Sequence, residues 1–199
     1  MPDHHDPPPE REPVSGTEKV GELETGPGGP AERNPGGSKA VLLLVPRAFC
    51  SQDYRAKGLP EGPVEVRFNA LTEQGEIRVG EHTFRVRKHG PASGHWTLEH
   101  EGTVLAEAEK PSALRSRFRI RTIEGTGFKE DLTLSPKRLL GGTWTLSYQS
   151  RLLGEIRPVH PFTRRMRLEC EPSVGLLIRL FAFWVVGMIR RRSAAAAAS

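Results

Sequence analysis

The chain of 199 residues contains only two cysteines, Cys50 and Cys170, and no apolar run in its first 39 residues. Two cysteines without motif spacing exclude a disulfide framework and a cysteine-ligated metal site. A secretory signal peptide needs a continuous apolar core, and none occurs between Met1 and Lys39. We therefore expect a cytoplasmic protein.

Motifs that organise catalytic chemistry are also missing. A Gly-rich stretch at residues 26–30 has no strand before it and no Gly-Lys-Ser/Thr after it, so it does not form a phosphate loop. The histidines at positions 82, 89, 95 and 100 cluster in sequence, but no pair has the ligand spacing of a metal site. Serine, histidine and aspartate follow no nucleophile–base pattern. We expect no enzymatic activity, no bound metal and no cofactor.

Hydrophobic residues make up only 36% of the chain, whereas glycine and proline are abundant at 21 and 17 residues. Residues 1–39 hold much of this Pro and Gly, and such a segment buries too little apolar surface to offset its ordering entropy. We predict a disordered tail over 1–39, an ambiguous linker over 40–63, a folded domain over 64–192 and a disordered Ala-rich tail over 193–199. The abrupt change of composition at Val64 suggests the hypothesis that the natural protein starts near there.

The net charge of +5 is unevenly distributed. Residues 1–63 carry 7 basic and 10 acidic residues, whereas residues 64–199 carry 22 and 14. The basic excess therefore belongs to the predicted folded part. Such a domain favours anionic partners, lipid headgroups or nucleic acid.

From Val64 onward, apolar residues alternate with polar ones, the pattern of half-buried strands. Gly80-Glu81 links two such segments and suits a type II′ hairpin turn. Prolines fall between the segments rather than within them. The pattern predicts about ten short antiparallel strands, whose apolar positions are Val64, Val66 and Phe68; Ile77 and Val79; Phe84 and Val86; Trp96 and Leu98; Val104, Ala106 and Ala108; Phe118 and Ile120; Leu132 and Leu134; Trp144, Leu146 and Tyr148; Leu153 and Ile156; and Met166 and Leu168.

Residues 94–120 and 142–168 are similar at a fixed offset of 48 positions. The identical pairs are Gly94 and Gly142, Trp96 and Trp144, Thr97 and Thr145, Leu98 and Leu146, Leu105 and Leu153, Glu107 and Glu155, Arg117 and Arg165, and Arg119 and Arg167. A repeat of this length predicts two copies of one supersecondary unit in a shared core.

The last predicted element is a helix from Val174 to about Arg192, with Ser173 as its N-cap. Its centre, residues 176–189, is apolar all round except at Arg179, so it must be buried in protein or in a bilayer. The 16 residues from Val174 to Ile189 span about 24 Å, less than the roughly 30 Å of a hydrocarbon core. A closed β-barrel offers the interior that such a helix needs. The membrane alternative stays open because Arg190-Arg191-Arg192 would suit a cytoplasmic flank.

A barrel built from a duplicated hairpin and ending in an apolar helix resembles the tubby C-terminal-like superfamily, which includes LURP-one-related proteins and phospholipid scramblases. The resemblance covers about residues 64–192. It is carried by the paired segments 94–98 and 142–146, the hairpins after them and the helix over 174–189. It implies a closed antiparallel barrel of about 10–12 strands, with the C-terminal helix threaded through it and Arg179 in or near the lumen.

Outward-facing arginines are the candidate site. One predicted strand alternates arginines with apolar residues, and the equivalent strand of the repeat supplies two more; the six candidates are Arg115, Arg117, Arg119, Arg121, Arg165 and Arg167. Arginine binds phosphate with a bidentate fork. The simpler interpretation, which we favour for this row, is a solvated surface where glutamates at positions 99, 107, 109 and 155 pair with arginines across strands. Nucleic acid would need exposed aromatic side chains for stacking, and Trp96 and Trp144 fall on the core face.

These observations favour a monomeric, non-enzymatic binding module that associates peripherally with a membrane through anionic lipid headgroups. Two alternatives remain open. One is a protein-interaction domain anchored in the membrane by the helix over 174–189. The other is scramblase-like lipid handling, which rests on resemblance alone.

Overall fold

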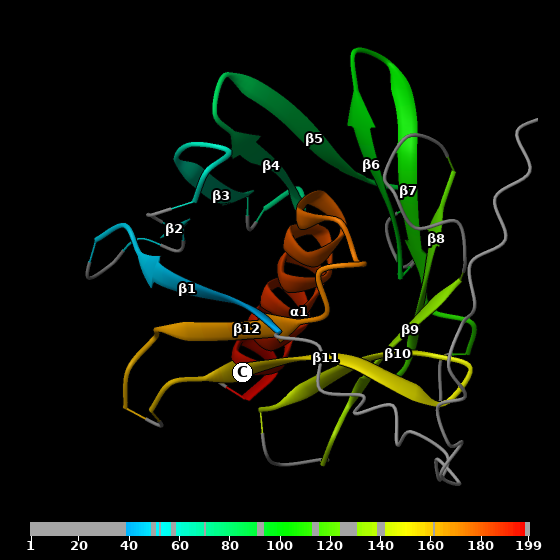
Figure 1. Ribbon diagram of the computed structural model, residues 1–199. Helices are drawn as coiled ribbons and strands as arrows, with labels where there is room; N and C mark the ends of the chain where they lie inside the picture. Colours follow the sequence, from blue (N-terminus) through cyan, green and yellow to red (C-terminus); the bar gives the residue numbers. More distant parts are fainter. Residues whose placement is uncertain are drawn as a thin grey trace, which may run out of the picture. The chain divides into compact units, whose positions relative to one another are not determined.

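In the computed structural model, residues 39–48, 51, 53–56, 59–69, 71–90, 94–112, 116–123, 131–138, 142–160 and 162–197 are described. They form twelve β-strands and one α-helix (Figure 1). The elements are β1 (Ala40–Pro46), β2 (Tyr54–Ala56), β3 (Val64–Asn69), β4 (Gln74–Val79), β5 (His82–Lys88), β6 (His95–His100), β7 (Thr103–Glu109), β8 (Phe118–Thr122), β9 (Leu132–Pro136), β10 (Trp144–Tyr148), β11 (Arg151–Pro158), β12 (Met166–Cys170) and α1 (Leu176–Ala197).

The strands form one closed antiparallel barrel in which each strand pairs with its neighbours in sequence. β1 closes the barrel by pairing with β12 on one side, Leu42 opposite Leu168, and with β2 on the other. Closure leaves no unpaired edge that could template aggregation. The predicted closed antiparallel barrel around a C-terminal helix is therefore confirmed, and the ten predicted strands correspond to β3–β12.

The segment 40–63, which the sequence left as an ambiguous linker, belongs to the barrel. It supplies β1 and β2, so the folded domain begins before Val64, and the predicted boundary at that residue is wrong. Alternation failed as a signal here because both faces of β1 are apolar. Leu42 and Leu44 are buried in the core, while Val41 and Leu43 face outward and are about half exposed.

Helix α1 lies inside the barrel, where the strands surround it (Figure 1). Residues 178–186 are all buried, and Trp184 and Leu180 are fully enclosed. The sequence left open whether this segment is buried in protein or in a bilayer, and in the structure it is buried in the protein interior. Within the described residues, no helix combines the length and apolarity that a membrane span requires.

The ends of α1 differ from the prediction. It begins two residues after Val174, and the Gly175 carbonyl accepts a hydrogen bond from the Arg179 N–H, 3.1 Å away. The Ser173 hydroxyl instead donates to Glu171, so the predicted Ser173 cap is wrong. The helix also continues to Ala197, which corrects the predicted disordered tail over 193–199 for its first five residues. Alanine has the highest helix propensity, so a run of alanines after a buried helix extends it.

Close contact between helix and wall is made possible by glycine. A Cβ at Gly187 would come within 2.6 Å of the Phe68 ring, so the absence of a side chain here lets the helix approach the wall. The Phe68 ring stacks on Trp184 with centroids 5.6 Å apart. The indole N–H of Trp184 donates to the Arg67 carbonyl at 3.1 Å, which satisfies its buried polar group.

Three hairpins have two-residue turns, each with the backbone that right-handed strand twist requires. Gly80 has φ 57° and Glu81 has no positive φ, which confirms the predicted type II′ turn. The β6–β7 turn has positive φ at Glu101 and Gly102, and the β10–β11 turn at Gln149 and Ser150. Both of these hairpins also carry a register shift at equivalent places, after Leu98 in β6 and after Leu146 in β10. The duplication itself stays a prediction from sequence.

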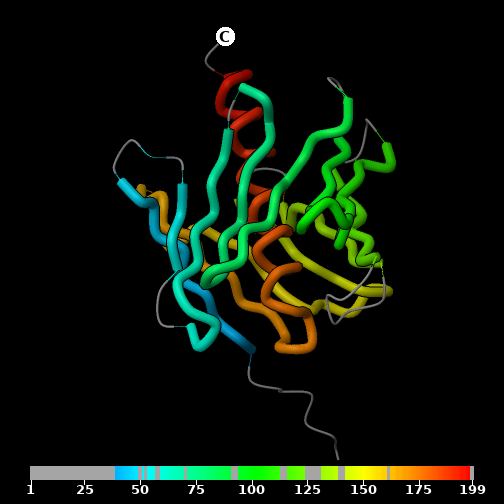
Figure 2. The backbone as a smooth tube through the Cα atoms, turned by 90° about the horizontal axis from the view of Figure 1, so that it is seen from above, coloured from blue at the N-terminus to red at the C-terminus, as the bar shows by residue number. Residues whose placement is uncertain are grey.

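Alternating strand directions place the chain connections at two ends of the barrel. We call the end at which α1 finishes the upper end and the end at which it begins the lower end (Figure 2). The upper end holds the β1–β2, β3–β4, β5–β6, β7–β8, β9–β10 and β11–β12 connections. The lower end holds the β2–β3, β4–β5, β6–β7, β8–β9 and β10–β11 connections and the link from β12 to α1.

Candidate anion-binding site

The predicted arginine row lies on the outer face of β8, as the alternation indicates. Phe118 and Ile120 are buried in the core, and Arg119 and Arg121 point outward between and after them. Arg117 precedes the strand and is exposed. Arg115 lies outside the described residues.

Carboxylates accompany most of this row. Arg119 forms an ion pair with Glu109 on β7, and Asp131 lies 3.9 Å from Arg119 and 3.7 Å from Arg121. On β12, Arg167 pairs with Glu169, which also accepts a hydrogen bond from Arg157 at 3.1 Å.

These contacts stabilise the charged forms of the acids. A hydrogen bond from Arg119 lowers the pKa of Glu109, and one from Arg157 lowers the pKa of Glu169. The side of the barrel is thus a solvated surface of cross-strand ion pairs, the simpler interpretation that we favoured for the arginine row. The pairs Arg87–Glu99 and Lys137–Glu155 extend this surface. Exposed pairs of this kind contribute about 0–1 kcal/mol each.

Arg117 and Arg165 differ from the rest of the predicted set. Both precede their strands at the upper end and are exposed. Neither makes an ion pair with any residue that the structure describes. They belong to a much larger basic surface.

The described connections at the upper end, with the last turns of α1, are strongly basic. They carry two acids, Asp53 and Glu73, against ten basic residues: Arg47, Lys110, Arg117, Lys137, Arg138, Arg164, Arg165, Arg190, Arg191 and Arg192. The described connections at the lower end carry the acids Glu61, Glu81, Glu101, Asp131 and Glu171 and no lysine or arginine, and Lys39 lies at the same end just before β1. The barrel therefore has a basic end and an acidic end.

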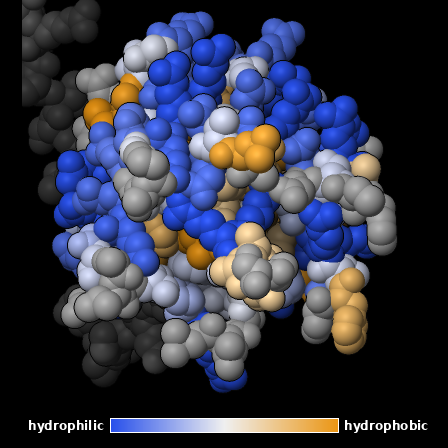
Figure 3. Space-filling view, turned by 180° about the vertical axis from the view of Figure 1, so that it is seen from behind, coloured by the Kyte–Doolittle hydropathy of each residue, from blue (hydrophilic) through white to orange (hydrophobic). Residues whose placement is uncertain are grey.

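Two large apolar side chains protrude from the basic end. Leu71 in the β3–β4 turn is 97% exposed and Phe162 in the β11–β12 connection is 92% exposed, the highest values among the large hydrophobic residues described. Seen from behind, the molecular surface is mainly hydrophilic, with small separate hydrophobic groups (Figure 3).

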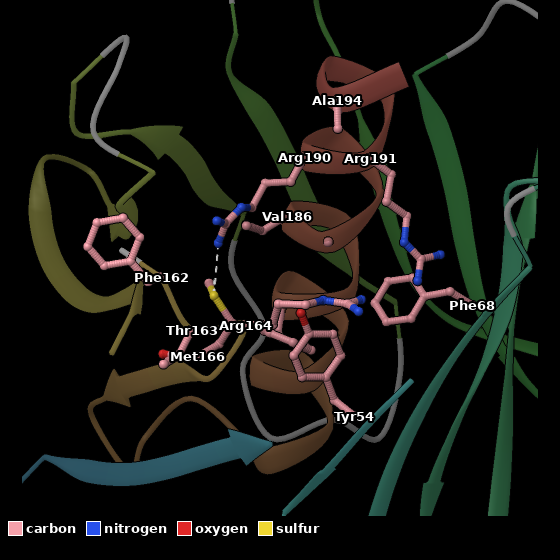
Figure 4. A pocket seen from close by; sticks show the side chains of 12 residues that line it. Tyr54, Phe68, Phe162, Thr163, Arg164, Met166, Val186, Arg190, Arg191 and Ala194 are labelled. Atoms are coloured by element: carbon pink, nitrogen blue, oxygen red, sulfur yellow. Dashed lines mark hydrogen bonds between the residues drawn. The ribbon is translucent and has the colours of Figure 1, made fainter. Parts of the chain in front are cut away.

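A pocket of about 330 Å³ opens at the upper end between α1, β2, β3 and β12 (Figure 4). Aromatic side chains form part of its wall, with the Tyr54 and Phe183 ring centroids 5.1 Å apart in an edge-to-face contact. Three arginines line it from two different segments: Arg190 and Arg191 from the helix and Arg164 from the β11–β12 connection. Pockets of this size at barrel mouths are typical binding sites for small molecules.

The helix arginines are held over soft, polarisable groups. The Arg191 guanidinium carbon lies 3.9 Å from the centroid of the Phe68 ring, a cation–π contact. Arg190 Nη1 donates toward the Met166 sulfur at 2.8 Å, and a thioether is only a weak acceptor.

Burial disfavours the charged form of Arg191. The pKa of Arg191 is lowered to about 10, mainly by desolvation; Tyr54 and Asp53 oppose this shift, and repulsion from Arg164 adds to it. Both lowering effects are those that a bound anion would oppose.

Beside the pocket, Glu73 fastens the end of the helix to the barrel rim. Its carboxylate accepts hydrogen bonds from Arg192, with Nε at 2.6 Å, and pairs with Lys88 on β5. The Arg192 guanidinium also lies 4.9 Å from the Trp96 ring centroid. The hydrogen bond from Arg192 is the main cause that lowers the pKa of Glu73 to about 2.

Near the lower end of the interior, Arg179 and Cys170 line a small cavity of about 10 Å³. Arg179 is 9% exposed, and its Nε finds no hydrogen-bond partner among the described residues. Burial raises the pKa of the Cys170 thiol to about 11, so it stays protonated at neutral pH. The cavity has room for about one water molecule, which limits this site to structural solvent.

The histidines make other contacts. His89 Nε2 lies 2.8 Å from the Thr97 hydroxyl, and the His82 and His100 rings meet edge to face. In the part of the chain that the structure describes, no group of three or more His, Cys, Asp or Glu side chains could hold a metal ion.

No family model, curated protein or solved structure matches this chain. The site is therefore interpreted from its own geometry and charge.

Sequence analysis found the arginines but not the pocket. The pocket is made by segments that are distant in the chain, with Tyr54 from β2, Phe68 from β3, Met166 from β12 and the end of α1. The sequence places Arg190 and Arg191 at the end of the apolar helix, where they could assist the exterior arginines at anionic headgroups, but gives no sign that they line a pocket. The signal that could have located it is an exposed Phe162 two residues before Arg164-Arg165, in a connection at the same end as the helix arginines.

Proposed function

We propose that the protein is a non-enzymatic binding module that associates peripherally with anionic membrane surfaces through its upper end. The observation that carries the proposal is the coincidence of charge and apolarity at that end. The end that holds most of the basic residues also presents Leu71 and Phe162 almost fully exposed.

Both features contribute to membrane affinity in the same geometry. Each basic residue close to an anionic bilayer contributes about 1 kcal/mol, and each large apolar side chain that leaves water contributes about 1.5–3 kcal/mol. With Leu71 and Phe162 on separate connections of one end, both can enter the interface while the barrel axis stands upright on the membrane. The acidic lower end would then point away from the bilayer.

The proposal moves the binding surface from the barrel side to the barrel end. Arg117 and Arg165 remain in it, whereas Arg119, Arg121 and Arg167 already have carboxylates beside them. The membrane-anchor alternative would require α1 to leave the barrel and expose its core face. Scramblase-like handling still rests on resemblance to the tubby-like superfamily alone, and fold does not imply function.

The first test is sedimentation of the full chain with phosphatidylcholine vesicles that contain or lack about one third phosphatidylserine. We expect binding only to the anionic vesicles and a steep decline with added salt, because surface charge interactions are screened within about 10 Å at 0.1 M salt. Replacing Leu71 and Phe162 together by serine should weaken binding by at least about tenfold, given the burial energies above.

The matched control replaces Val41 and Leu43 by serine. These side chains are also exposed and apolar but lie on the outer side of β1, so vesicle binding should be unchanged. Equal loss in the two double variants, or binding that does not respond to salt, would refute the proposal. Competition by single-stranded nucleic acid at equal charge would favour a nucleic-acid partner for the same basic surface.

A further inference from the structure

The pocket at the upper end combines two kinds of wall, one aromatic and one cationic. Tyr54, Phe68 and Phe183 provide aromatic surface. Arg164 and Arg191 reach the space beside Tyr54 and Phe68, whereas Arg190 points to the Met166 side of the pocket (Figure 4). A ligand that matches it has an anionic group at one end and an apolar group at the other.

Arg164 and Arg191 hold positive charge close together in a partly desolvated place. Arg191 is half-buried over Phe68, and Arg164 is near enough to repel it. Arg190 directs an N–H toward the Met166 sulfur, which is a poor substitute for a charged oxygen. A bound oxyanion would relieve the repulsion and offer stronger acceptors than the thioether.

We propose that this pocket binds one phosphate monoester that carries an apolar group, with the arginines on the phosphate and the aromatic wall against the apolar part. The inference deepens the proposed function and depends on it for one of two possible sources of the ligand. The monoester can be the headgroup of a membrane lipid such as a phosphatidate or a soluble organic phosphate.

A phosphate monoester fits better than the other common anions. Its second pKa is about 6, so it carries nearly two negative charges at pH 7, and the neighbouring positive charges of Arg164 and Arg191 match a dianion better than a singly charged carboxylate. Its oxygens match the fork geometry of guanidinium groups. The pocket is larger than inorganic phosphate needs and lies in the range, about 300–1,000 Å³, that holds small organic molecules.

The test measures binding of soluble probes by titration calorimetry, with no membrane present. The probes are dihexanoylphosphatidic acid below its micelle concentration, phenyl phosphate, inorganic phosphate and dihexanoylphosphatidylcholine. We expect at least one of the two monoesters to bind about tenfold or more tightly than inorganic phosphate, because only they reach the aromatic wall. The choline lipid, whose phosphate is a diester beside a cation, should not bind.

Two variants on α1 separate the pocket from the general surface charge. Ala194 is exposed and lines the pocket, whereas Ala196 is exposed on the same turn and does not line it. Ala194→Glu should weaken monoester binding by about tenfold, since it puts a carboxylate beside the arginines. Ala196→Glu makes the same change of net charge and should leave monoester affinity unchanged.

The outcomes distinguish the pocket from membrane association. Tight binding of the phosphatidate alone supports a lipid source, and tight binding of phenyl phosphate supports a soluble one. Equal effects of the two glutamate variants, or monoesters that bind no better than inorganic phosphate, would overturn the pocket proposal. Phosphatidylserine vesicles contain no monoester, so binding of the wild type to them tests the proposed function separately. The two glutamate variants should bind these vesicles equally well.

Discussion

The two ends of this barrel are built from different kinds of chain connection. At the lower end, three of the connections are two-residue turns, at residues 80–81, 101–102 and 149–150, with acidic residues in two of them. At the upper end, every strand connection spans four or more residues, and the end of α1 adds three arginines. Half of the lower-end connections are two-residue turns, whereas the upper end has none and carries longer segments with protruding side chains.

The difference separates the determinants of fold from the determinants of binding. Two-residue turns with positive φ fix strand register and leave few side chains free for other contacts. Longer connections are less constrained and are where binding residues usually occur on a rigid scaffold. The upper end also contains the pocket, whose floor is the barrel core itself through Phe183 and Phe68. If only the upper end binds, matched changes at the two ends should have different effects on binding.

The largest expected effect comes from charge reversal at each end. Arg117→Glu with Arg165→Glu, both at the upper end, should weaken binding to phosphatidylserine vesicles by on the order of a hundredfold, because basic residues near such a surface contribute about 1 kcal/mol each. Lys39→Glu with Arg151→Glu makes the same net change at the lower end and should alter binding less than about threefold. The measurement is vesicle sedimentation at 0.1 M salt. Equal losses would show that net charge, and not its location, controls association.

The next effect concerns stability and pH at the upper end. Glu73→Gln should reduce the free energy of unfolding by about 2 kcal/mol at pH 7, after allowance for partial solvent screening, because it removes the acceptor for Arg192 and Lys88. The pKa of Glu73 is lowered from 4.5 to about 2. Its contribution is therefore complete above pH 4.5 and is lost as pH falls from there toward 2.

Denaturant unfolding of wild type and variant between pH 2 and 7 checks this prediction. The difference between the two proteins should vanish near pH 2. Glu171→Gln is the matched control at the lower end, where Glu171 pairs with a well-exposed Arg151 at 2.7 Å, and should cost less than about 1 kcal/mol. A difference between Glu73→Gln and wild type that persists at pH 2 would assign the loss to packing and not to charge.

Much of the fold could be predicted from sequence because apolar and polar residues alternate along most of its strands. In β8, for example, Phe118 and Ile120 are buried and Arg121 is exposed, and this contrast is visible in the residue types. β1 could not be recognised because Val41 and Leu43 on its outer face are as apolar as Leu42 and Leu44 on its inner face. The end of α1 was placed too early because composition suggested low complexity where alanines simply continue the helix.

The candidate site was predictable in residue type but not in arrangement. The outward face of Arg119 followed from alternation, but its neighbour Asp131 lies just before β9, and only strand pairing brings the two together. The pocket depends on contacts between segments more than 100 residues apart, such as Phe68 and Arg191. No local sequence pattern encodes such a contact, because the contact depends on the position of the helix along the barrel axis.

The smallest expected effect tests the lower end as a purely structural region. Ser150 has φ 82° in the β10–β11 turn, nearly the same as the φ 83° of Gly102 in the β6–β7 turn. A residue with a Cβ pays about 1 kcal/mol or more for this conformation, and glycine does not. Ser150→Gly should therefore raise the free energy of unfolding by about 1 kcal/mol, and Gly102→Ser should lower it by a similar amount. Both are measured by urea denaturation. Because the change is confined to the lower end, neither variant should alter vesicle binding or monoester affinity; a loss of either would mean that the two ends are coupled through the barrel.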